Sequence, residues 1–331
     1  MDGLPRTFTD LVGCRLPLQL APMGGGAGTP ELAVAVCRAG GLGMVSASHL
    51  VPLTDQLRAL ESAGATPAGV GFFGWELAHR EADLELAASR VRVVDVFWGV
   101  PDTTVVELVH RHGALMLCQV GALTEALAAV DSGCDAVVAQ GVEAGGHVRG
   151  VTPLLALLDE VVAHVPVPVV AAGGIATSRR VREVLSAGAS AVRVGTRLLA
   201  TNESAAHPDY LAALVAARGS ETELTTAFHL GWEDAPHRVL RSAIRAAAAA
   251  KGTDGAVGET AIGGQSWAVP RWSSQPPSTF CTGDIAAMAM YAGMSVDDVD
   301  DVAPAADIVA RLFDLSPGAG GATASAGRTS P

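Results

Sequence analysis

A repeating phrase runs from Leu16 to about Thr201: a helical pattern, a glycine, and then a short apolar run that ends in a polar or glycine-rich turn. The stretches 133–138 and 188–194 show it clearly. A glycine can adopt the left-handed conformation that ends a helix, and apolar runs of this length suit strands that are buried on both faces. The repeat therefore predicts strands alternating with helices around a parallel sheet.

The number of repeats indicates how the sheet is arranged. The helices between the strands are expected to begin at capping residues such as Thr29, Thr124 and Thr177. Eight evenly spaced strands favour a closed (β/α)8 TIM barrel, and an open doubly wound sheet is the alternative. The predicted strands lie near residues 16–21, 42–45, 68–72, 92–97, 114–119, 135–140, 167–172 and 191–194.

The strand signal stops after Thr201. Segments Pro208 to Arg218 and Pro236 to Lys251 are typical of helices and lie within a mainly irregular stretch. We therefore expect a smaller, mainly helical cap subdomain at 202–280, which would carry substrate contacts. The barrel would comprise residues 1–201 and 281–315.

The C-terminal part of the chain is expected to return to the barrel. A helical stretch should open at Thr282-Gly283-Asp284, and a last helix from Ala303 to Leu315 could pack on the barrel. Residues 316–331 are mostly Gly, Ala, Ser, Thr and Pro. They contain too few large apolar groups to offset the conformational entropy that folding would cost. They are predicted to form a disordered tail.

Charge and hydropathy exclude several classes of partner. Asp and Glu number 34 against 22 Lys and Arg, a formal charge of −12, and no basic stripe could neutralise a nucleic acid backbone. The longest apolar stretch, 161–175, is broken before the roughly 18–20 residues needed to cross a bilayer. Residues 1–10 lack the basic and apolar segments of a secretory signal. The expected location is the cytoplasm.

The five cysteines are odd in number, widely separated and never in a Cys-x-x-Cys pair. This pattern is typical of reduced, mostly buried thiols rather than disulfides or a zinc site, so no metal is expected. The cysteines are Cys14, Cys37, Cys118, Cys134 and Cys281.

In a (β/α)8 barrel the functional groups lie where strands end and loops begin. After the first strand, Pro22 fixes the backbone and Gly24 to Gly26 let a flat ligand approach main-chain amides. After the sixth strand, Gln140 places an amide at the strand tip, and Gly145-Gly146-His147 brings an imidazole of near-neutral pKa over the barrel mouth. A histidine that is merely solvated is the alternative.

The last two strand ends predict a phosphate site. Gly173-Gly174-Ile175 follows the seventh strand, and Gly195-Thr196 follows the eighth. Glycines expose backbone N–H groups, Thr196 adds a hydroxyl, and the positive end of a following helix favours an anion. Loops after strands seven and eight commonly bind phosphate in these barrels. A phosphate-bearing ligand is therefore expected.

Taken together, these motifs resemble the nitronate monooxygenase (2-nitropropane dioxygenase) family in order and spacing. The likeness extends from about Leu16 to Phe313. The segments that carry it are Ala21-Pro22-Met23, Phe72-Phe73, the run from Gln140 to His147, Ala172-Gly173-Gly174-Ile175, Arg193-Val194-Gly195-Thr196, Gly263-Gly264-Gln265, Pro270-Arg271-Trp272-Ser273-Ser274 and Ala289-Met290-Tyr291-Ala292-Gly293.

The resemblance implies a non-covalently bound FMN, with its phosphate on the Gly173-Gly174 and Gly195-Thr196 loops. It implies His147 as the general base that takes the α-proton of a nitroalkane or holds a nitronate. The flavin accepts an electron, and dioxygen completes conversion to a carbonyl compound and nitrite. The residues it places around the cofactor are Ala21, Pro22, Met23, Gly71, Gln140, Gly145, Gly146, Gly173, Gly174, Arg193, Val194, Gly195 and Thr196.

Two positions depart from the family pattern. The family commonly has an Asn, with its side chain on the flavin, where this chain has Gly71, and a Gln where this chain has Met294. Both changes remove a polar group, so a less polar ring environment and a substrate other than a simple nitronate are expected.

Other activities remain open on the sequence. Flavin-dependent enoyl-thioester and quinone reductases that use NAD(P)H resemble the same barrel and its Gly-Gly-His loop, although no separate Gly-x-Gly-x-x-Gly turn is present. A flavin-binding barrel without turnover is a third alternative. Trp232, Trp267 and Trp272 could be pocket walls or core, and the sequence leaves open whether the chain forms a homodimer.

Overall fold

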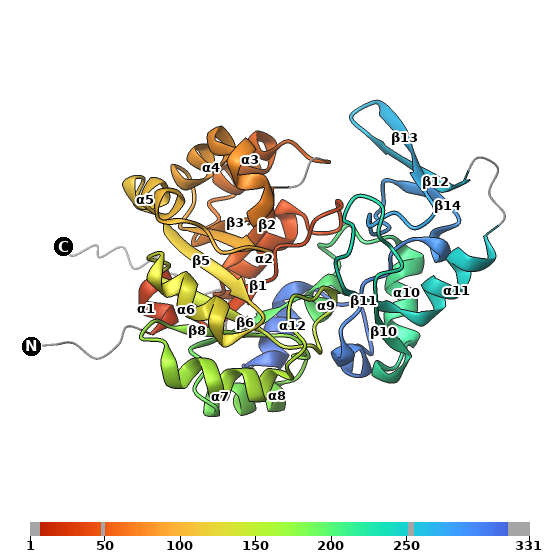
Figure 1. The fold of residues 1–331 in the computed structure, drawn as a ribbon. Helices are drawn as coiled ribbons and strands as arrows, with labels where there is room; N and C mark the ends of the chain where they lie inside the picture. The colour runs from red at the N-terminus through yellow and green to blue at the C-terminus, as the bar shows by residue number, and fades with distance from the viewer. Residues whose placement is uncertain (1–6, 48–49, 251–254, 317–331) are drawn as a thin grey trace, which may run out of the picture.

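The computed structural model describes residues 7–47, 50–250 and 255–316. Its main sheet contains eight parallel strands in the order β1-β9-β8-β6-β5-β4-β3-β2. The sheet closes because Leu20 N–H donates to Leu42 O (2.9 Å) and Leu42 N–H donates to Leu18 O (2.8 Å). The predicted (β/α)8 barrel is confirmed (Figure 1). The strands are β1 (Leu18–Leu20), β2 (Gly43–Ser46), β3 (Ala68–Phe73), β4 (Val93–Phe97), β5 (Leu115–Val120), β6 (Ala136–Gln140), β8 (Val169–Ala172) and β9 (Ala191–Val194).

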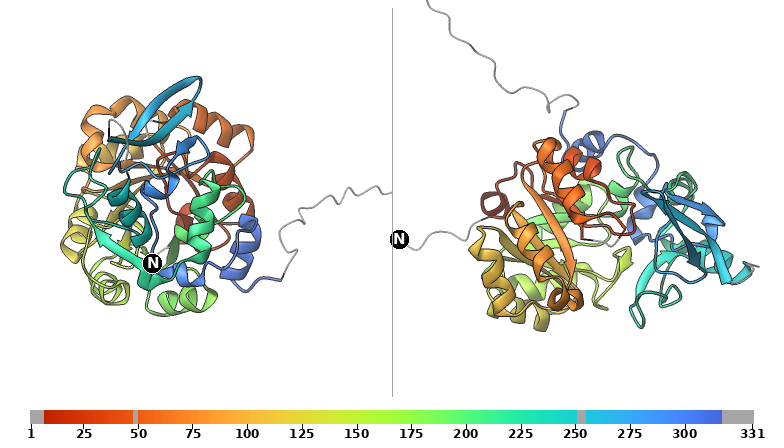
Figure 2. Two further views of the ribbon diagram at one scale, coloured as in Figure 1. Left: turned by 90° about the vertical axis from the view of Figure 1, so that its right-hand side faces the viewer. Right: turned by 90° about the horizontal axis from the view of Figure 1, so that it is seen from above.

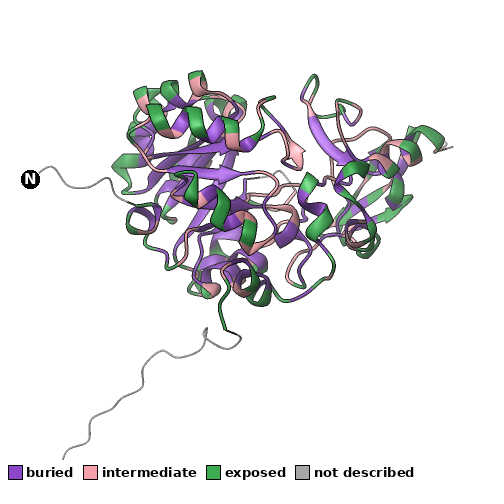
Figure 3. Cartoon of the chain, turned by 90° about the horizontal axis from the view of Figure 1, so that it is seen from below, coloured by how far each residue is buried: buried purple, intermediate pink, exposed green. Residues whose placement is uncertain are grey.

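Helices surround the barrel, and its strands are buried between them and the barrel interior (Figure 3). In β6, for example, Val137 and Val138 point to opposite faces and neither is exposed to solvent. Apolar runs without polar alternation are therefore the expected sequence of these strands. The helices are α1 (Phe8–Val12), α2 (Pro30–Ala39), α3 (Leu53–Ser62), α4 (Glu81–Ala88), α5 (Thr103–Arg111), α6 (Leu123–Asp131), α7 (Leu154–His164), α8 (Ser178–Ser186), α9 (Thr196–Leu199) and α12 (Ala305–Leu312), with the 3-10 helix η1 (Gly74–His79).

Side-chain caps start two of the three helices for which they were predicted. Thr29 accepts from Leu32 N–H, and Thr177 accepts from Arg180 N–H. The prediction for Thr124 is wrong, because α6 begins one residue earlier, with Ala122 at its N-cap and no side-chain hydrogen bond. Thr124 is exposed in the first turn.

A second unit follows β9 and contains more strand than the mainly helical cap that was expected. Its helices are α10 (Pro208–Ala216) and α11 (Arg241–Ala249). One three-stranded sheet joins β10 (Thr222–Thr225), β11 (His237–Leu240) and β7 (Gly146–His147), and another joins β13 (Gln265–Pro270), β12 (Ala256–Ile262) and β14 (Cys281–Gly283). Short 3-10 helices are η2 (Gly219–Glu221), η4 (Ile285–Ala287) and η5 (Met294–Asp298).

Tertiary packing explains the two helices that were predicted wrongly. The segment Pro236 to Lys251 begins as strand β11, because all four of its residues are buried between neighbouring elements, and becomes helical only at Arg241. Thr282 and Gly283 belong to β14, which pairs with β12, and only a single 3-10 turn follows. Pairing partners distant in sequence outweigh local propensity here.

The cap has its own hydrophobic core, which includes Tyr210, Phe228 and Val239. Met288 and Val296 share this core, so we propose that the cap continues to about residue 299 rather than ending at 280. Figure 2 shows the cap elements grouped over one end of the barrel.

Helix α12 returns to the barrel, as predicted, and Ile308, Val309 and Leu312 are buried in the barrel core. The predicted disordered tail lies outside the described residues, apart from Ser316. All five cysteines are buried and free. Within the described ranges, no helix is long and apolar enough to span a membrane.

Thr29 offers a test of how α2 is held. Its hydroxyl also donates to Glu203 O (2.7 Å), which joins α2 to the chain after the barrel. We expect Thr29→Ala to lower the free energy of unfolding by about 1–2 kcal/mol, because the cap and this bond are both lost. Unfolding in urea measures this change in the free energy of unfolding. Thr124→Ala is the control and should change stability by less than about 0.5 kcal/mol; equal losses in both variants would contradict the role of the cap.

Candidate active site

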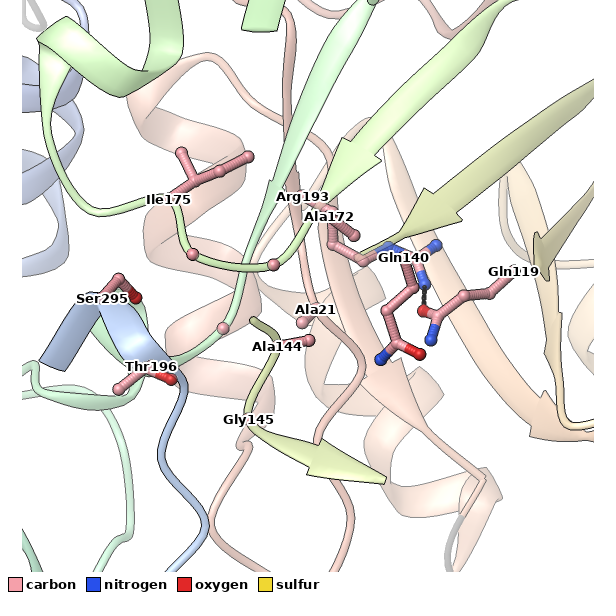
Figure 4. Close-up of a pocket in the computed structure, with 13 residues that line it drawn as sticks. Ala21, Gln119, Gln140, Ala144, Gly145, Ala172, Ile175, Arg193, Thr196 and Ser295 are labelled. Carbon is pink, nitrogen blue, oxygen red and sulfur yellow. Dashed lines mark hydrogen bonds between the residues drawn. The ribbon is translucent and has the colours of Figure 1, made fainter. Parts of the chain in front are cut away.

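A cavity of about 620 Å³ lies between the carboxyl ends of the barrel strands and the cap. A narrower recess of about 70 Å³ adjoins it, and the two share walls at Ala21, Gly195 and Thr196. Figure 4 shows the recess, with Thr196 and Ser295 on one side and Gln119 and Gln140 on the other. A wide chamber that ends in a narrow recess matches a ligand with a broad ring and a compact end group.

The recess is lined by backbone of the two loops that were predicted to bind phosphate. Gly173 and Gly174 both have positive φ (106° and 67°), a conformation that favours glycine. The N–H groups of Gly174 and Ile175 donate to no acceptor within the described part of the chain. The helix after Gly195 is a single turn, so its dipole contributes less to anion binding than expected. Amide donors and the Thr196 hydroxyl are therefore the main features of this recess.

His147 is held by the cap as well as by the barrel. It forms with Gly146 the short strand β7, which pairs antiparallel with β11 in the register His147 to His237. Val148 N–H donates to Pro236 O (2.8 Å), and the Arg238 guanidinium donates to Val142 O from two nitrogens (3.2 and 2.9 Å). Cross-strand pairing therefore orders this loop, although it contains two adjacent glycines.

Gln140, at the tip of β6, fixes the same loop from the barrel side. Its Nε2 donates to His147 O (2.9 Å), and its Oε1 accepts from Arg149 N–H (3.2 Å). The amide therefore positions the backbone on both sides of Val148. Gln140 also lines both cavities.

The His147 imidazole faces an apolar environment. Its ring stacks on the Trp232 indole, with centroids 3.8 Å apart and planes 25° apart. Its Nε2 is fully buried and has no hydrogen-bond partner among the residues that the structure describes. Burial, followed by the neighbouring His237, lowers the pKa of His147 to about 3. The ring is therefore neutral near pH 7, and His147 lines the large cavity.

His237 is neutral for a geometric reason. Its Nδ1 contacts Ala235 O (2.8 Å), which requires a proton on that nitrogen, and its Nε2 accepts from Phe228 N–H (3.2 Å), which excludes a proton there. Burial lowers its pKa as well. His237 is thus a structural neighbour of His147, with ring centroids 5.2 Å apart.

Aromatic side chains form the outer wall of the large cavity. Trp232 makes edge contacts with Phe73 (4.6 Å between centroids) and Phe97 (6.3 Å), and Tyr291 lies 5.6 Å from the His147 ring. Trp75, half-exposed, stacks on Phe73. Of the three tryptophans that the sequence left open, Trp232 is a pocket wall, Trp272 packs on the cap core, and Trp267 lies on the β12–β13 hairpin away from both cavities.

The floor of the cavity is polar and lies inside the barrel. Arg193 Nη2 donates to Asp95 Oδ1 (2.6 Å), Nη1 donates to Gln119, and Nε donates to Gln19 (3.2 Å). Asp95 is fully buried, and burial raises the pKa of its carboxyl although Arg193 opposes this. Within the described ranges, Asp95 Oδ2 and Gln19 Nε2 have no hydrogen-bond partner.

The structure brings most of the predicted site residues together. Gly173, Gly174 and Arg193 line the recess; Val194 is buried in β9 and lines neither cavity. The residues on the large cavity are Ala21, Pro22, Met23, Gly71, Gln140, Gly145, Gly146, His147, Gly195 and Thr196.

Several lining residues were missed, among them Asp95, Gln119 and Ser295. Asp95 and Gln119 had a signal, because each is a polar residue within an otherwise apolar buried strand, where a polar group needs a partner. Ser295 and Tyr291 lie in irregular cap segments and carried no such signal.

The two departures from the family pattern differ in their structural effect. A Cβ atom at Gly71 would lie 2.6 Å from Pro22 Cβ, so this wall has no room for a side chain without movement of Pro22. Met294 is 42% exposed and lines neither cavity. The Met294 substitution therefore leaves the cavity walls unchanged.

The family model named nitronate monooxygenase matches residues 6–84 and 76–314. The chain belongs to this family, and it is a flavin-dependent oxidoreductase. No three His, Cys, Asp or Glu side chains of the described residues group closely enough to hold a metal ion.

Three similar proteins illustrate the relationship. A nitronate monooxygenase from Pseudomonas aeruginosa is 32% identical over 66% of this chain and 76% of its own. A hydroxy-methyl-oxo-octahydroindene-carboxyl-CoA dehydrogenase from Rhodococcus jostii is 33% identical over 73% of this chain and 67% of its own. The solved structure of a nitroalkane oxidase from Streptomyces ansochromogenes superposes with a TM-score of 0.72, at 30% identity, over 92% of this chain and 96% of the other.

The lowered pKa of His147 predicts a pH effect on stability. Between the unfolded value of 6.5 and the folded value of about 3, the unfolded chain binds a proton that the folded protein does not, so stability falls as pH falls through 6.5. We expect wild type to lose about 1–2 kcal/mol more between pH 7 and pH 5 than His147→Gln, measured by urea unfolding. The exposed His229→Gln should behave as wild type, and equal losses in all three proteins would contradict the lowered pKa.

Proposed function

We propose that the protein binds FMN non-covalently and oxidises a nitronate or a related carbon acid with dioxygen. The observation that carries this proposal is a neutral imidazole with a free nitrogen on a chamber that ends in a recess of backbone amides. Membership of the nitronate monooxygenase family supports the reaction class.

The residues present suit FMN. The phosphate would lie in the recess on the N–H groups of Gly174 and Ile175 and on the Thr196 hydroxyl. The isoalloxazine ring would occupy the wide chamber beside Ala21 to Met23. When bound, FMN supplies the electron acceptor that a carbanion next to it requires.

His147 is the proposed general base. Its free Nε2 can accept the α-proton of a neutral nitroalkane, while Trp232 and Gln140 hold the ring and its backbone in place. A base with a pKa of about 3 accepts such a proton poorly. A nitronate already carries the negative charge, which would raise the pKa of His147 and favour hydrogen bonding from the imidazole to the anion. The site therefore favours the nitronate over the neutral nitroalkane.

Substrate preference tests this proposal. Purified protein should show the visible absorption of oxidised flavin, and an alkyl nitronate should bleach it without oxygen and release nitrite in air. We expect a higher kcat/KM for the nitronate than for the parent nitroalkane. No bleaching and no nitrite would exclude this substrate class, while a protein that stays colourless with added FMN would exclude the cofactor.

Replacing His147 tests its role. His147→Ala should lower kcat/KM by on the order of 10²–10⁴, because the proton acceptor or donor is lost. The exposed His229→Ala should retain wild-type activity. Unchanged activity in both variants would show that His147 takes no part in turnover, as expected of a flavin-binding barrel without a catalytic base.

A second candidate is FMN-dependent reduction of an enoyl thioester or a quinone, with NAD(P)H as the reductant. The size of the chamber, its aromatic wall and the resemblance to the Rhodococcus CoA dehydrogenase favour it. Rapid anaerobic bleaching by NADH or NADPH, with none by a nitronate, would choose this activity.

A further inference from the structure

Asp95 has one oxygen that the protein does not use. Arg193 engages Oδ1, whereas Oδ2 is buried and has no partner within the described residues. The residue is fully buried, and it belongs to the residues that line the large cavity. A buried carboxylate oxygen without a partner costs free energy unless a ligand or a bound water supplies a donor.

The position of Asp95 relates it to Gly71. The two residues are partners in the parallel pairing of β3 and β4, so their side-chain positions face the same side of the sheet. Pro22 closes the space in which a side chain at position 71 would lie. Ser46 on β2 and Asp95 on β4 pair in register with Gly71 from either side. Of these two residues, Asp95 carries the buried side-chain oxygen without a partner among the described residues.

Arg193, which is itself held by Gln119 and Gln19, holds Asp95 in place. The guanidinium spans the barrel interior from β9 to β4 and β5, and its three donor directions end on Asp95, Gln119 and Gln19. These bonds leave the carboxylate little rotational freedom. They also make the free oxygen an acceptor in a fixed place, as a binding site requires.

We propose that Asp95 is a flavin-binding residue, whose Oδ2 accepts a hydrogen bond from an N–H of the isoalloxazine ring in place of the side chain that Gly71 lacks. This inference rests on the proposed binding of FMN. The oxidised ring carries an N–H on its pyrimidine edge, and a carboxylate is its natural acceptor.

The test separates a ring contact from a phosphate contact. FMN and riboflavin share the ring, and only FMN carries the phosphate. Asp95→Asn keeps the shape and an acceptor for Arg193 but places an amide where the carboxylate was, so it should weaken binding of both ligands by a similar factor, on the order of 10- to 100-fold. Thr196→Val should weaken FMN binding and leave riboflavin binding unchanged. Quenching of flavin fluorescence on titration measures both affinities.

Two controls complete the design. Asp135→Asn removes a carboxylate at the opposite end of the barrel, next to His110, and should change neither affinity. If Asp95→Asn does not fold, as judged by circular dichroism, Asp95→Ser in the same comparison takes its place. Unchanged riboflavin affinity in the Asp95 variant, or a loss confined to FMN, overturns the inference. Wild-type protein that binds neither ligand overturns the proposed function instead.

Discussion

The pairing of β7 with β11 is the interaction on which the site depends. Two residues of a barrel loop join a cap sheet, and their register sets where the His147 ring lies relative to Trp232 and His237. On the barrel side, the loop is attached through Gln140 and through the ion pair of Arg149 with Glu125 on α6. Because the strand is so short, its order comes from its neighbours, above all from the Arg238 bonds to Val142 O.

The barrel and the cap contribute different parts of the site. Backbone of the β8 and β9 loops forms the narrow recess, with Gly173 and Gly174 in conformations that other residues adopt rarely. The cap adds Trp232 and Tyr291 to an aromatic wall that also contains Phe73 and Phe97 of the barrel strands, and it completes the sheet that holds the imidazole. Electrostatics follow this division, since the interior carries the buried Asp95–Arg193 pair while His147 and His237 are neutral in a largely apolar chamber.

Prediction from sequence succeeded where local pattern and global fold agree. All eight barrel strands lie within about two residues of the predicted ranges, because a strand buried on both faces must be an apolar run and its glycine-marked ends are visible in the chain. The glycine loops after β8 and β9 were located for the same reason. The cap strands were missed because their stability comes from pairing across long sequence separations, as in β12 with β14. The Asp95–Arg193 contact joins residues 98 positions apart, and neither side chain reveals its partner in sequence.

The attachment of β7 to the cap limits how a substrate can enter. A cap that swung away as a rigid body would carry β11 with it and would either break the pairing or pull His147 out of the chamber. Opening by such a hinge would dismantle the site at each turnover. Trp75 and Leu230, both partly exposed on the cavity rim, belong to no part of that pairing. If small molecules enter past these two side chains as they rotate, the pairing of β7 with β11 and the position of His147 are unchanged.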